Sequence, residues 1–202
     1  MPNPARTDHD ILPAFQHRWS PRAYADRPVD GADLKRCLEA ARWAASSFNE
    51  QPWRLIVGVK DHPELGDTHA KILDILAPPN AAWAEKAHVL LVGIYKEAFT
   101  KNNKPNRCAP HDLGAACAQM ASQAAELGLQ AHGMAGLDLD ATRRAFDIPD
   151  GYQPWTAWAI GHPGDPADLP EDWMRDAETA ERARHPFDQW VFGGSFAQPA
   201  AL

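Results

Sequence analysis

Cysteine is scarce in this sequence, and the few cysteines are not arranged in pairs. Three occur among 202 residues, Cys37, Cys108 and Cys117, and none belongs to a C-x-x-C pair. An odd number of widely spaced cysteines argues against a disulfide scaffold and against a zinc site. Unpaired thiols are typical of a reducing compartment, so we expect a cytoplasmic protein.

Long apolar runs and concentrated positive charge are missing too. No apolar run approaches the ~20 residues that a membrane span requires, and residues 1–10 lack the apolar region of a secretory signal. The formal net charge is −7 and the basic residues are scattered. This disfavours nucleic acid, because phosphate binding needs a concentrated basic surface. We therefore expect neither a membrane nor a nucleic acid as a partner.

The sequence also lacks the short motifs of several enzyme classes. It has no G-x-G-x-x-G or G-x-x-x-x-G-K-[ST] loop for nucleotides, and none of its nine histidines lies in H-E-x-x-H or another metal-ligand spacing. No G-x-S-x-G turn and no acid–base pair mark a protein nucleophile. We expect no metal, and if the protein is an enzyme, a cofactor carries its chemistry.

With 45% hydrophobic residues and no internal repeat, the chain is predicted to form one domain over 1–202. Helical spacing of apolar residues predicts helices over 8–18, 30–45, 63–76, 112–127 and 139–148. Short apolar runs predict buried strands over 55–59, 89–95 and 155–160, with an extended segment at 130–136. Residues 78–80 are expected to break a helix, and 97–110 to form a mobile surface loop or a cover over a pocket.

A polar loop at 45–53 carries the densest group of hydrogen-bonding side chains. Between Ala45 and Trp53 it holds two hydroxyls and two carboxamides, and Pro52 restricts its backbone. Such donors and acceptors suit the edge of a flat, heteroatom-rich ligand. They would equally satisfy backbone groups at the end of a helix, so the loop alone leaves both interpretations open.

A second polar segment concentrates positive charge near the N-terminus. Arg18 and Arg22 flank Ser20 in a compact corner, because Pro21 prevents a helix from continuing there. Arginines in this arrangement suit bidentate phosphate contacts. Two solvated arginines on a surface turn are nevertheless the commoner outcome for such a segment taken alone.

Residues 165–202 are polar and punctuated by proline, yet aromatic side chains recur along them. The large apolar residues that we expect to be buried are Trp173, Phe187, Trp190, Val191, Phe192 and Phe196. An extended tail with this pattern would suit an arm that packs on a partner subunit. The same tail carries a basic cluster at Arg182 and Arg184.

Taken together, four segments resemble the nitroreductase family of flavoenzymes. They are R-W-S-P-R at 18–22, S-S-F-N-E-Q-P-W at 46–53, the alanine-rich helix that ends in E-L-G-L at 126–129, and A-I-G-H-P at 159–163. Their order and spacing match the family from about Phe15 to Arg184, and the loop is the most specific of the four. The resemblance implies an α+β fold with a central mixed sheet flanked by helices, and an intertwined homodimer with two FMN molecules at the subunit interface.

The resemblance also implies cofactor contacts, and it assigns no catalytic side chain because FMN carries the chemistry. Arg18, Trp19, Ser20 and Arg22 match the segment that holds the FMN phosphate, ribityl chain and pyrimidine edge. Ser46, Ser47 and Asn49 match the loop that reaches the same flavin from the other subunit. Met134, Ala135 and Gly136 match a strand end that gives a backbone N–H to flavin N5, and Arg182 and Arg184 match phosphate ligands in the tail.

Some positions depart from the family pattern. Ala135 stands where the family often has glutamate or another polar residue, a change that affects substrate preference more than a backbone contact. The 97–110 link is shorter than the substrate-covering region of other members, and Asn80 falls near a family asparagine that contacts the pyrimidine. Arg18 is our candidate for stabilising the negative charge of reduced FMN near N1 and the C2 carbonyl.

The activity that the resemblance implies is FMN-dependent reduction of nitroaromatic, quinone or enone-like acceptors with NAD(P)H. NAD(P)H would bind transiently and leave before the small-molecule acceptor binds, which is a ping-pong order. Two alternatives stay open. One is an FMN-binding protein without turnover, for storage or sensing, and the other is a flavin-dependent relative that dehalogenates its substrate or degrades flavin.

Overall fold

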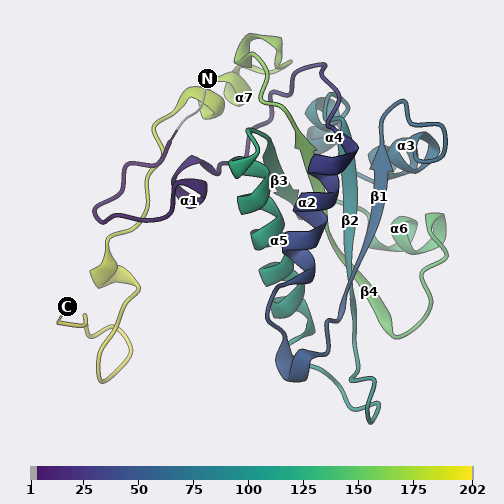
Figure 1. The fold of residues 1–202 in the computed structure, drawn as a ribbon. Helices are drawn as coiled ribbons and strands as arrows, with labels where there is room; N and C mark the ends of the chain where they lie inside the picture. The colour runs from purple at the N-terminus through teal and green to yellow at the C-terminus, as the bar shows by residue number, and fades with distance from the viewer. Residues whose placement is uncertain (1–3, 202) are drawn as a thin grey trace.

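The computed structural model describes residues 4–201, so the first three residues of the 1–10 segment and the last residue of the tail lie outside it. Its centre is a four-stranded sheet in the spatial order β1-β2-β4-β3 (Figure 1). The strands are β1 (Trp53–Val59), β2 (Val89–Lys96), β3 (Gln130–Met134) and β4 (Tyr152–Gly161). Strands are present at the three predicted places, but only β2 is buried along most of its length, since most of β1 is half-buried and Trp155 in β4 is exposed. The predicted extended segment forms β3, and the α+β fold class is confirmed.

Every neighbouring pair in this sheet is antiparallel, whereas the resemblance implied a mixed sheet. β1 pairs with β2, β2 with β4, and β3 with β4, all in antiparallel register. β2 and β3 do run in the same direction, as expected for strands that are joined through a long helix. Because β4 lies between them, the expectation of a mixed sheet is wrong for the described part of this chain.

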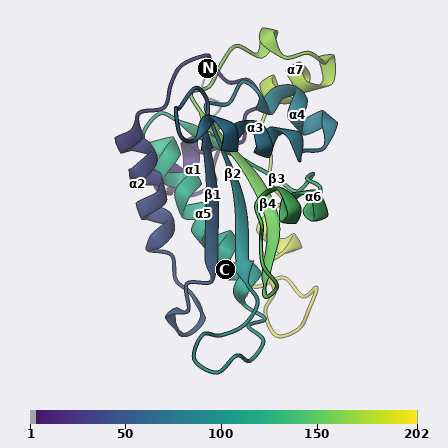
Figure 2. The same ribbon diagram turned by 90° about the vertical axis from the view of Figure 1, so that its right-hand side faces the viewer.

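Helices cover both faces of the sheet (Figure 2). They are α1 (Pro13–His17), α2 (Gly31–Arg42), α3 (Gly66–Asp74), α4 (Pro78–Ala84), α5 (Ala109–Glu126), α6 (Leu139–Ala145) and α7 (Asp172–Thr179). α2 and α5 enclose one apolar core with the sheet, and α3, α4, α6 and α7 contribute to a second core on the other face. β2 is buried from Val89 to Ile94, because both of its faces are covered. Within residues 4–201, no helix has the length and hydropathy to cross a membrane.

Local sequence explains where several helices begin. Asp30 caps α2 by accepting a hydrogen bond from the Ala32 N–H at 2.7 Å, which is what an aspartate at this position favours. α3 ends at Asp74, so the expected break of this helix by residue 78 is confirmed. Pro78 also opens α4, which was not predicted, because proline is tolerated in a first turn. One expectation about a proline is wrong, since α3 begins at Gly66, beyond the predicted start at residue 63.

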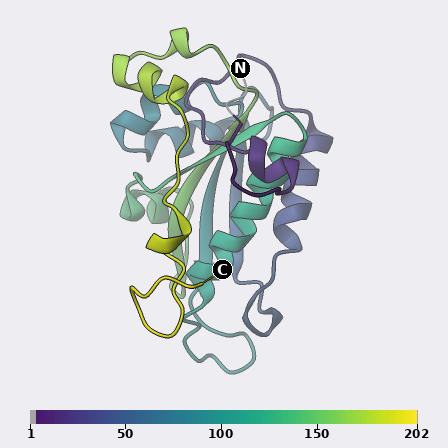
Figure 3. The same ribbon diagram turned by 90° about the vertical axis from the view of Figure 1, so that its left-hand side faces the viewer.

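The segment before α1 and the tail after α7 extend away from the sheet on the same side of the molecule (Figure 1), and they lie in front of it when viewed from that side (Figure 3). In the tail, Phe187, Trp190 and Phe196 are 50%, 59% and 90% exposed, and their rings contact one another, Phe192 or His9. The expectation that these aromatic side chains are buried is wrong for a single chain, because the tail leaves the core before they occur.

Candidate functional site

The predicted arginines of the N-terminal segment and the tail meet beside the first residues of β3. Burial, and next the charge of Arg184, lower the pKa of the Arg18 guanidinium. Burial, and next the charges of Arg18 and Arg184, lower the pKa of Arg182. Within residues 4–201, no carboxylate lies within ion-pair distance of Arg18 or Arg184. The guanidinium groups of Arg18 and Arg184 thus lie near each other without an ion-pair partner in the described residues, which favours an anion as ligand.

Two predicted residues in the same segment lie close to this positive charge. Arg18 donates from Nη1 to Ser20 Oγ at 3.2 Å, and Ser20 itself is exposed. Trp19 is buried at 8% exposure, and no group of the described chain accepts a hydrogen bond from its Nε1. A buried indole N–H without a partner is unusual in a folded protein, so a further acceptor is expected beside it.

The guanidinium group of Arg182 holds the segment before Trp19 by donating to its backbone carbonyl groups. Its Nη1 donates to Gln16 O at 3.2 Å and its Nη2 donates to Arg18 O at 2.8 Å. Arg182 was predicted as a phosphate ligand, yet in this structure its guanidinium orders the backbone that carries Arg18. Arg22, by contrast, places its guanidinium 5.2 Å from the centroid of the Trp173 ring.

Three polar residues that sequence reasoning missed also hold this segment. Gln130, buried at the start of β3, accepts from the Trp19 N–H at 3.0 Å and donates to His17 O at 3.1 Å. Glu178, buried in α7, accepts from the N–H groups of Arg22 and Ala23. His132 Nδ1 lies 2.8 Å from Pro21 O, so the nitrogen donates to that carbonyl. The signal for Glu178 was present, because a glutamate four residues after the core residue Met174 occupies the apolar face of its helix.

His132 is neutral in the folded protein. Burial lowers its pKa from 6.5 to about 4, the hydrogen bond to Pro21 O opposes this shift, and the nearby charges of Arg22 and Arg18 reinforce it. Its ring centroid lies 4.6 Å from that of Trp83. Burial is the main reason that the imidazole stays unprotonated, and a third positive charge beside Arg18 and Arg22 is disfavoured as well.

We expect the free energy of unfolding to fall as the pH is lowered from the pKa of an unfolded histidine towards about 4. In this window the unfolded chain binds a proton at His132 that the folded chain does not bind, because the folded-state pKa is depressed. With ~1.4 kcal/mol for each pKa unit, up to about 3 kcal/mol is lost. Urea unfolding at a series of pH values measures this loss.

The matched variant is His132→Asn, because asparagine does not titrate. The buried His69 and the half-buried His88 and His162 also have pKa values lowered first by burial, and they titrate equally in both proteins. The difference between the two pH profiles therefore isolates residue 132. Equal losses of stability in the two proteins would contradict the assignment.

The predicted strand end lies further along β3. Gly136 O accepts from Asn80 Nδ2 at 3.0 Å and from the Ala77 N–H at 2.9 Å. Neither the Ala135 N–H nor the Gly136 N–H donates to another group within residues 4–201, and Ala135 is exposed, whereas Met134 is buried. β3 is an edge strand, so this side of its backbone is open to a ligand. Asn80 thus holds the backbone at Gly136 in place through its amide group.

The arginine segment and the strand end share one edge of the sheet. Gln130 and His132 hold the segment at one end of β3, and Met134 is its last residue. At ~3.3 Å for each residue, the ends of this strand lie about 13 Å apart. Nine of the predicted residues thus lie in the segments next to the two ends of β3: Arg18, Trp19, Ser20, Arg22, Met134, Ala135, Gly136, Arg182 and Arg184.

The predicted loop residues Ser46, Ser47 and Asn49 lie elsewhere. The Ser47 N–H donates to Asp112 Oδ2 at 3.0 Å, and Asp112 is a buried carboxylate in the first turn of α5. The arginines lie beyond the other end of α5, whose 18 residues extend about 27 Å. One chain therefore cannot bring this loop to its own arginine cluster.

The loop is held in an unusual backbone conformation. Phe48, Asn49 and Gln51 have φ values of 53°, 55° and 50°, a region that costs non-glycine residues of order 1 kcal/mol or more each. Hydrogen bonds fix it, from the Asn49 N–H to Ser46 O and from the Gln51 N–H to Ser46 Oγ, both at 3.0 Å. Strain of this kind is concentrated at functional sites, and Phe48 is 93% exposed at its centre.

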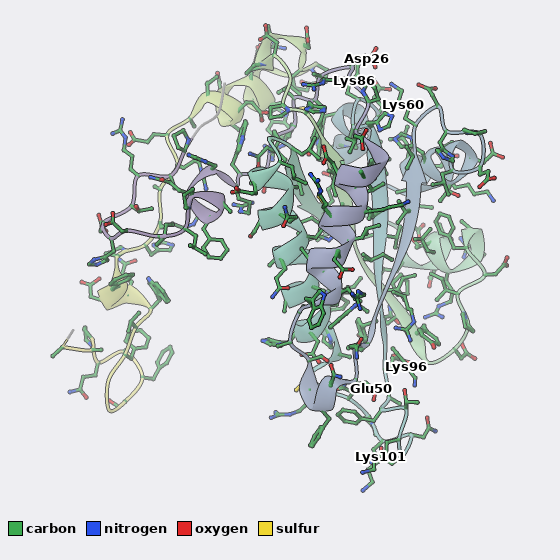
Figure 4. The ribbon with its side chains drawn as sticks, in the orientation of Figure 1. Asp26, Glu50, Lys60, Lys86, Lys96 and Lys101 are labelled. Carbon is green, nitrogen blue, oxygen red and sulfur yellow. The ribbon has the colours of Figure 1, made fainter. Side chains whose placement is uncertain are left out.

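A polar network ties this loop to the 97–110 link. Glu50 accepts from the Thr100 N–H at 2.8 Å and from its hydroxyl group, and Lys96 Nζ lies 3.7 Å from Glu50 Oε1. Figure 4 shows Glu50 and Lys96 together at the end of the molecule where β2 leaves the sheet. The rings of Phe48 and Phe99 meet edge to face, 5.8 Å apart. The link thus supports the loop from the same chain.

The residues along β3 fit the phosphate and ring edge of FMN. Uncompensated guanidinium groups and a serine hydroxyl suit a phosphate dianion, and backbone N–H groups without partners suit acceptor atoms of a heteroaromatic ring. Among residues 4–201, no group of three histidine, cysteine or acidic side chains could hold a metal ion. The guanidinium, hydroxyl and backbone N–H donors suit an organic phosphate.

Comparison with known proteins agrees with this geometry. The model of the family described as the nitroreductase family matches residues 15–162. An uncharacterized 15.4 kDa protein of Mycolicibacterium smegmatis is 32% identical over 133 residues, which are 66% of this chain and 87% of that protein. A Methanothermobacter thermautotrophicus protein with the provisional name NADH dehydrogenase/NAD(P)H nitroreductase is 29% identical over 77% of this chain and 78% of its own.

Solved structures share the fold. A crystal structure of an oxidoreductase containing FMN superposes with a TM-score of 0.88 and 34% identity, over 97% of this chain and 98% of its own. A nitroreductase family protein of Clostridium difficile superposes with a TM-score of 0.65 and 25% identity, over 88% and 94% of the two chains. The family match extends from the segment before Arg18 to the end of β4, and so includes both halves of the candidate site except the tail arginines. The chain belongs to the nitroreductase family.

Proposed function

We propose that the protein is an FMN-dependent oxidoreductase that uses NAD(P)H to reduce nitroaromatic, quinone or enone-like acceptors. The observation that carries the proposal is that Arg18 and Arg184, which have no ion-pair partner in residues 4–201, and two backbone N–H donors without a partner in the same residues flank β3. The relative of known structure that contains FMN and the name of the archaeal relative support the cofactor and the co-substrate.

Each group has a separate task in this proposal. Arg22 and Arg184 bind the phosphate with Ser20, and Arg18 stabilises negative charge at the pyrimidine edge of the reduced ring. The N–H groups of Ala135 and Gly136 face the ring edge at N5. FMN, when bound, supplies the hydride chemistry. No side chain acts as a nucleophile, so NAD(P)H and the acceptor use the same place in turn, in a ping-pong order.

The proposed active form is a homodimer, in the cytoplasm. The loop of Ser46, Ser47 and Asn49 lies at the opposite end of α5 from the arginines, so it completes a site only in another copy. A two-fold axis would place each loop against the partner's arginine cluster and create two equal sites. The exposed aromatic residues of the tail would then be buried against the partner.

The test is a purified protein titrated with FMN and assayed with NAD(P)H. We expect a yellow protein with an FMN spectrum that oxidises NADH or NADPH in the presence of a nitroarene or a quinone. Retention of FMN without saturable NAD(P)H oxidation would identify a binding protein for storage or sensing, and release of halide or of a flavin fragment would identify the other relatives. A colourless protein that does not bind added FMN would refute the proposal.

A further inference from the structure

Three residues in α7 or just after it contact the segment at 18–23 that carries Arg18 and Arg22. The proposed cofactor contacts do not require these interactions. Glu178, in the last turn of α7, accepts from the Arg22 N–H at 3.1 and 3.0 Å and from the Ala23 N–H at 3.0 Å. The ring of Trp173, in the first turn, lies beneath the Arg22 guanidinium. Just beyond the helix, Arg182 donates to two carbonyl groups on the other side of the segment.

Glu178 is an unusual residue for such a position. Only 4% of it is exposed, and a buried carboxylate is tolerated where hydrogen bonds replace its hydration. Its donors here are backbone N–H groups, which leaves the guanidinium groups of the segment available to another anion. The same helix is anchored in the core by Met174, which is 1% exposed, so its position is set by the fold.

We propose that Glu178 is a positioning residue: it fixes the backbone at Arg22 and Ala23, and it thereby aims Arg22 at the phosphate of the ligand. This inference rests on the proposed function for the identity of the ligand, and it adds that α7 determines how well the phosphate is held. Glu178 does not touch the ligand in this account. It acts through the two amide groups that it fixes.

A positioning role for Glu178 and a simple effect of its negative charge predict opposite changes in phosphate binding when Glu178 is replaced. A carboxylate near the arginines would repel a phosphate, so loss of its charge alone would strengthen phosphate binding. Loss of positioning would weaken it, because the guanidinium groups would no longer be held in one geometry. Riboflavin lacks the phosphate, so it reports binding of the ring and ribityl chain alone.

The experiment compares apoprotein titrations with FMN and with riboflavin, followed by flavin fluorescence, for the wild type, Glu178→Ala and Glu178→Gln. We expect the FMN-to-riboflavin affinity ratio to fall about tenfold in Glu178→Ala, the effect of unmaking one buried hydrogen-bonded group. Glu178→Gln keeps one acceptor oxygen, so its FMN-to-riboflavin affinity ratio should lie between those of the wild type and Glu178→Ala. Asp176→Asn, on the exposed side of α7, is the matched control and should keep the wild-type ratio.

Hydrogen exchange of the apoprotein provides the readout that does not depend on flavin. Peptides covering residues 18–24 should exchange faster in Glu178→Ala than in Asp176→Asn, while peptides from α5 stay protected in both. An unchanged or increased affinity ratio, or unchanged exchange at 18–24 in a variant that melts as one folded species, would overturn the inference. Absence of FMN binding by the wild type would refute the proposed function, and the exchange result would still decide whether Glu178 fixes the segment.

Discussion

Replacement of Arg18 by methionine is expected to weaken FMN binding by about 10- to 100-fold. Hydrogen bonds that involve a charged group contribute roughly 1.5–3 kcal/mol, and ~1.4 kcal/mol corresponds to a factor of ten in affinity. Methionine keeps the length and the apolar stem of arginine, so packing against the segment is largely retained. Titration of the apoprotein with FMN, followed by quenching of flavin fluorescence, measures the change.

The same substitution should not destabilise the apoprotein. The pKa of Arg18 is lowered by burial and by the charge of Arg184, which means that the fold disfavours its positive charge. Removal of that charge should leave the melting temperature of the apoprotein unchanged or raise it, while FMN binding weakens. Arg144→Met, at an exposed position on α6, is the control and should alter neither. A variant that loses stability and keeps its FMN affinity would show that Arg18 serves the fold and not the ligand.

Dimers that combine one Arg18→Met chain with one Asn49→Gly chain are expected to bind FMN at a concentration at which neither variant binds it alone. Arg18→Met damages the arginine cluster, and Asn49→Gly removes a side chain from the loop without backbone strain, because residue 49 has a φ of 55°. In a mixed dimer one site has both defects and the other has none. An equal mixture of the two chains should therefore recover about one quarter of the wild-type sites at an FMN concentration that fills neither parent.

This recovery depends on the separation of the two clusters. If the loop and the arginines of one chain served the same site, every site in the mixture would carry one defect, and no recovery would occur. The geometry argues against that arrangement, because Ser47 is bonded at the first turn of α5 and Gln130 follows its last turn. Dimers carrying two different affinity tags, isolated from co-expressed chains, give the cleanest measurement.

The sequence predicts the elements of this fold better than their pairing. Asp30 identifies the start of α2 because a cap is a local interaction, and the apolar runs identify the strands because burial on both faces leaves a continuous pattern. The position of β4 between β2 and β3 depends on contacts between distant residues, which no local pattern encodes. The expectation of a mixed sheet came from the family resemblance, and it is wrong for the described part of this chain. The start of α4 at Pro78 was missed because proline was taken only as the end of the preceding helix, although it is also tolerated in a first turn.

The sequence predicts the site residues that belong to a recognisable motif. It does not predict the residues elsewhere in the chain that hold the motif in place by hydrogen bonds. Arg18, Ser20 and Arg22 are found through the R-W-S-P-R segment, and the structure places them together with Arg184. Gln130, His132 and Glu178 were missed because each acts on the backbone of that segment from more than a hundred residues away. Gln130 and His132 become recognisable only when their burial is known, whereas the spacing of Glu178 from Met174 was a signal in the sequence.

The most direct test of the account is the mass of the native protein with its cofactor. Native mass spectrometry of the protein reconstituted with FMN should show a species of two chains and two FMN molecules, because each site combines the arginine cluster of one chain with the loop of the other. A monomer that carries one FMN would contradict the shared site. A dimer that carries none after reconstitution would contradict the cofactor itself.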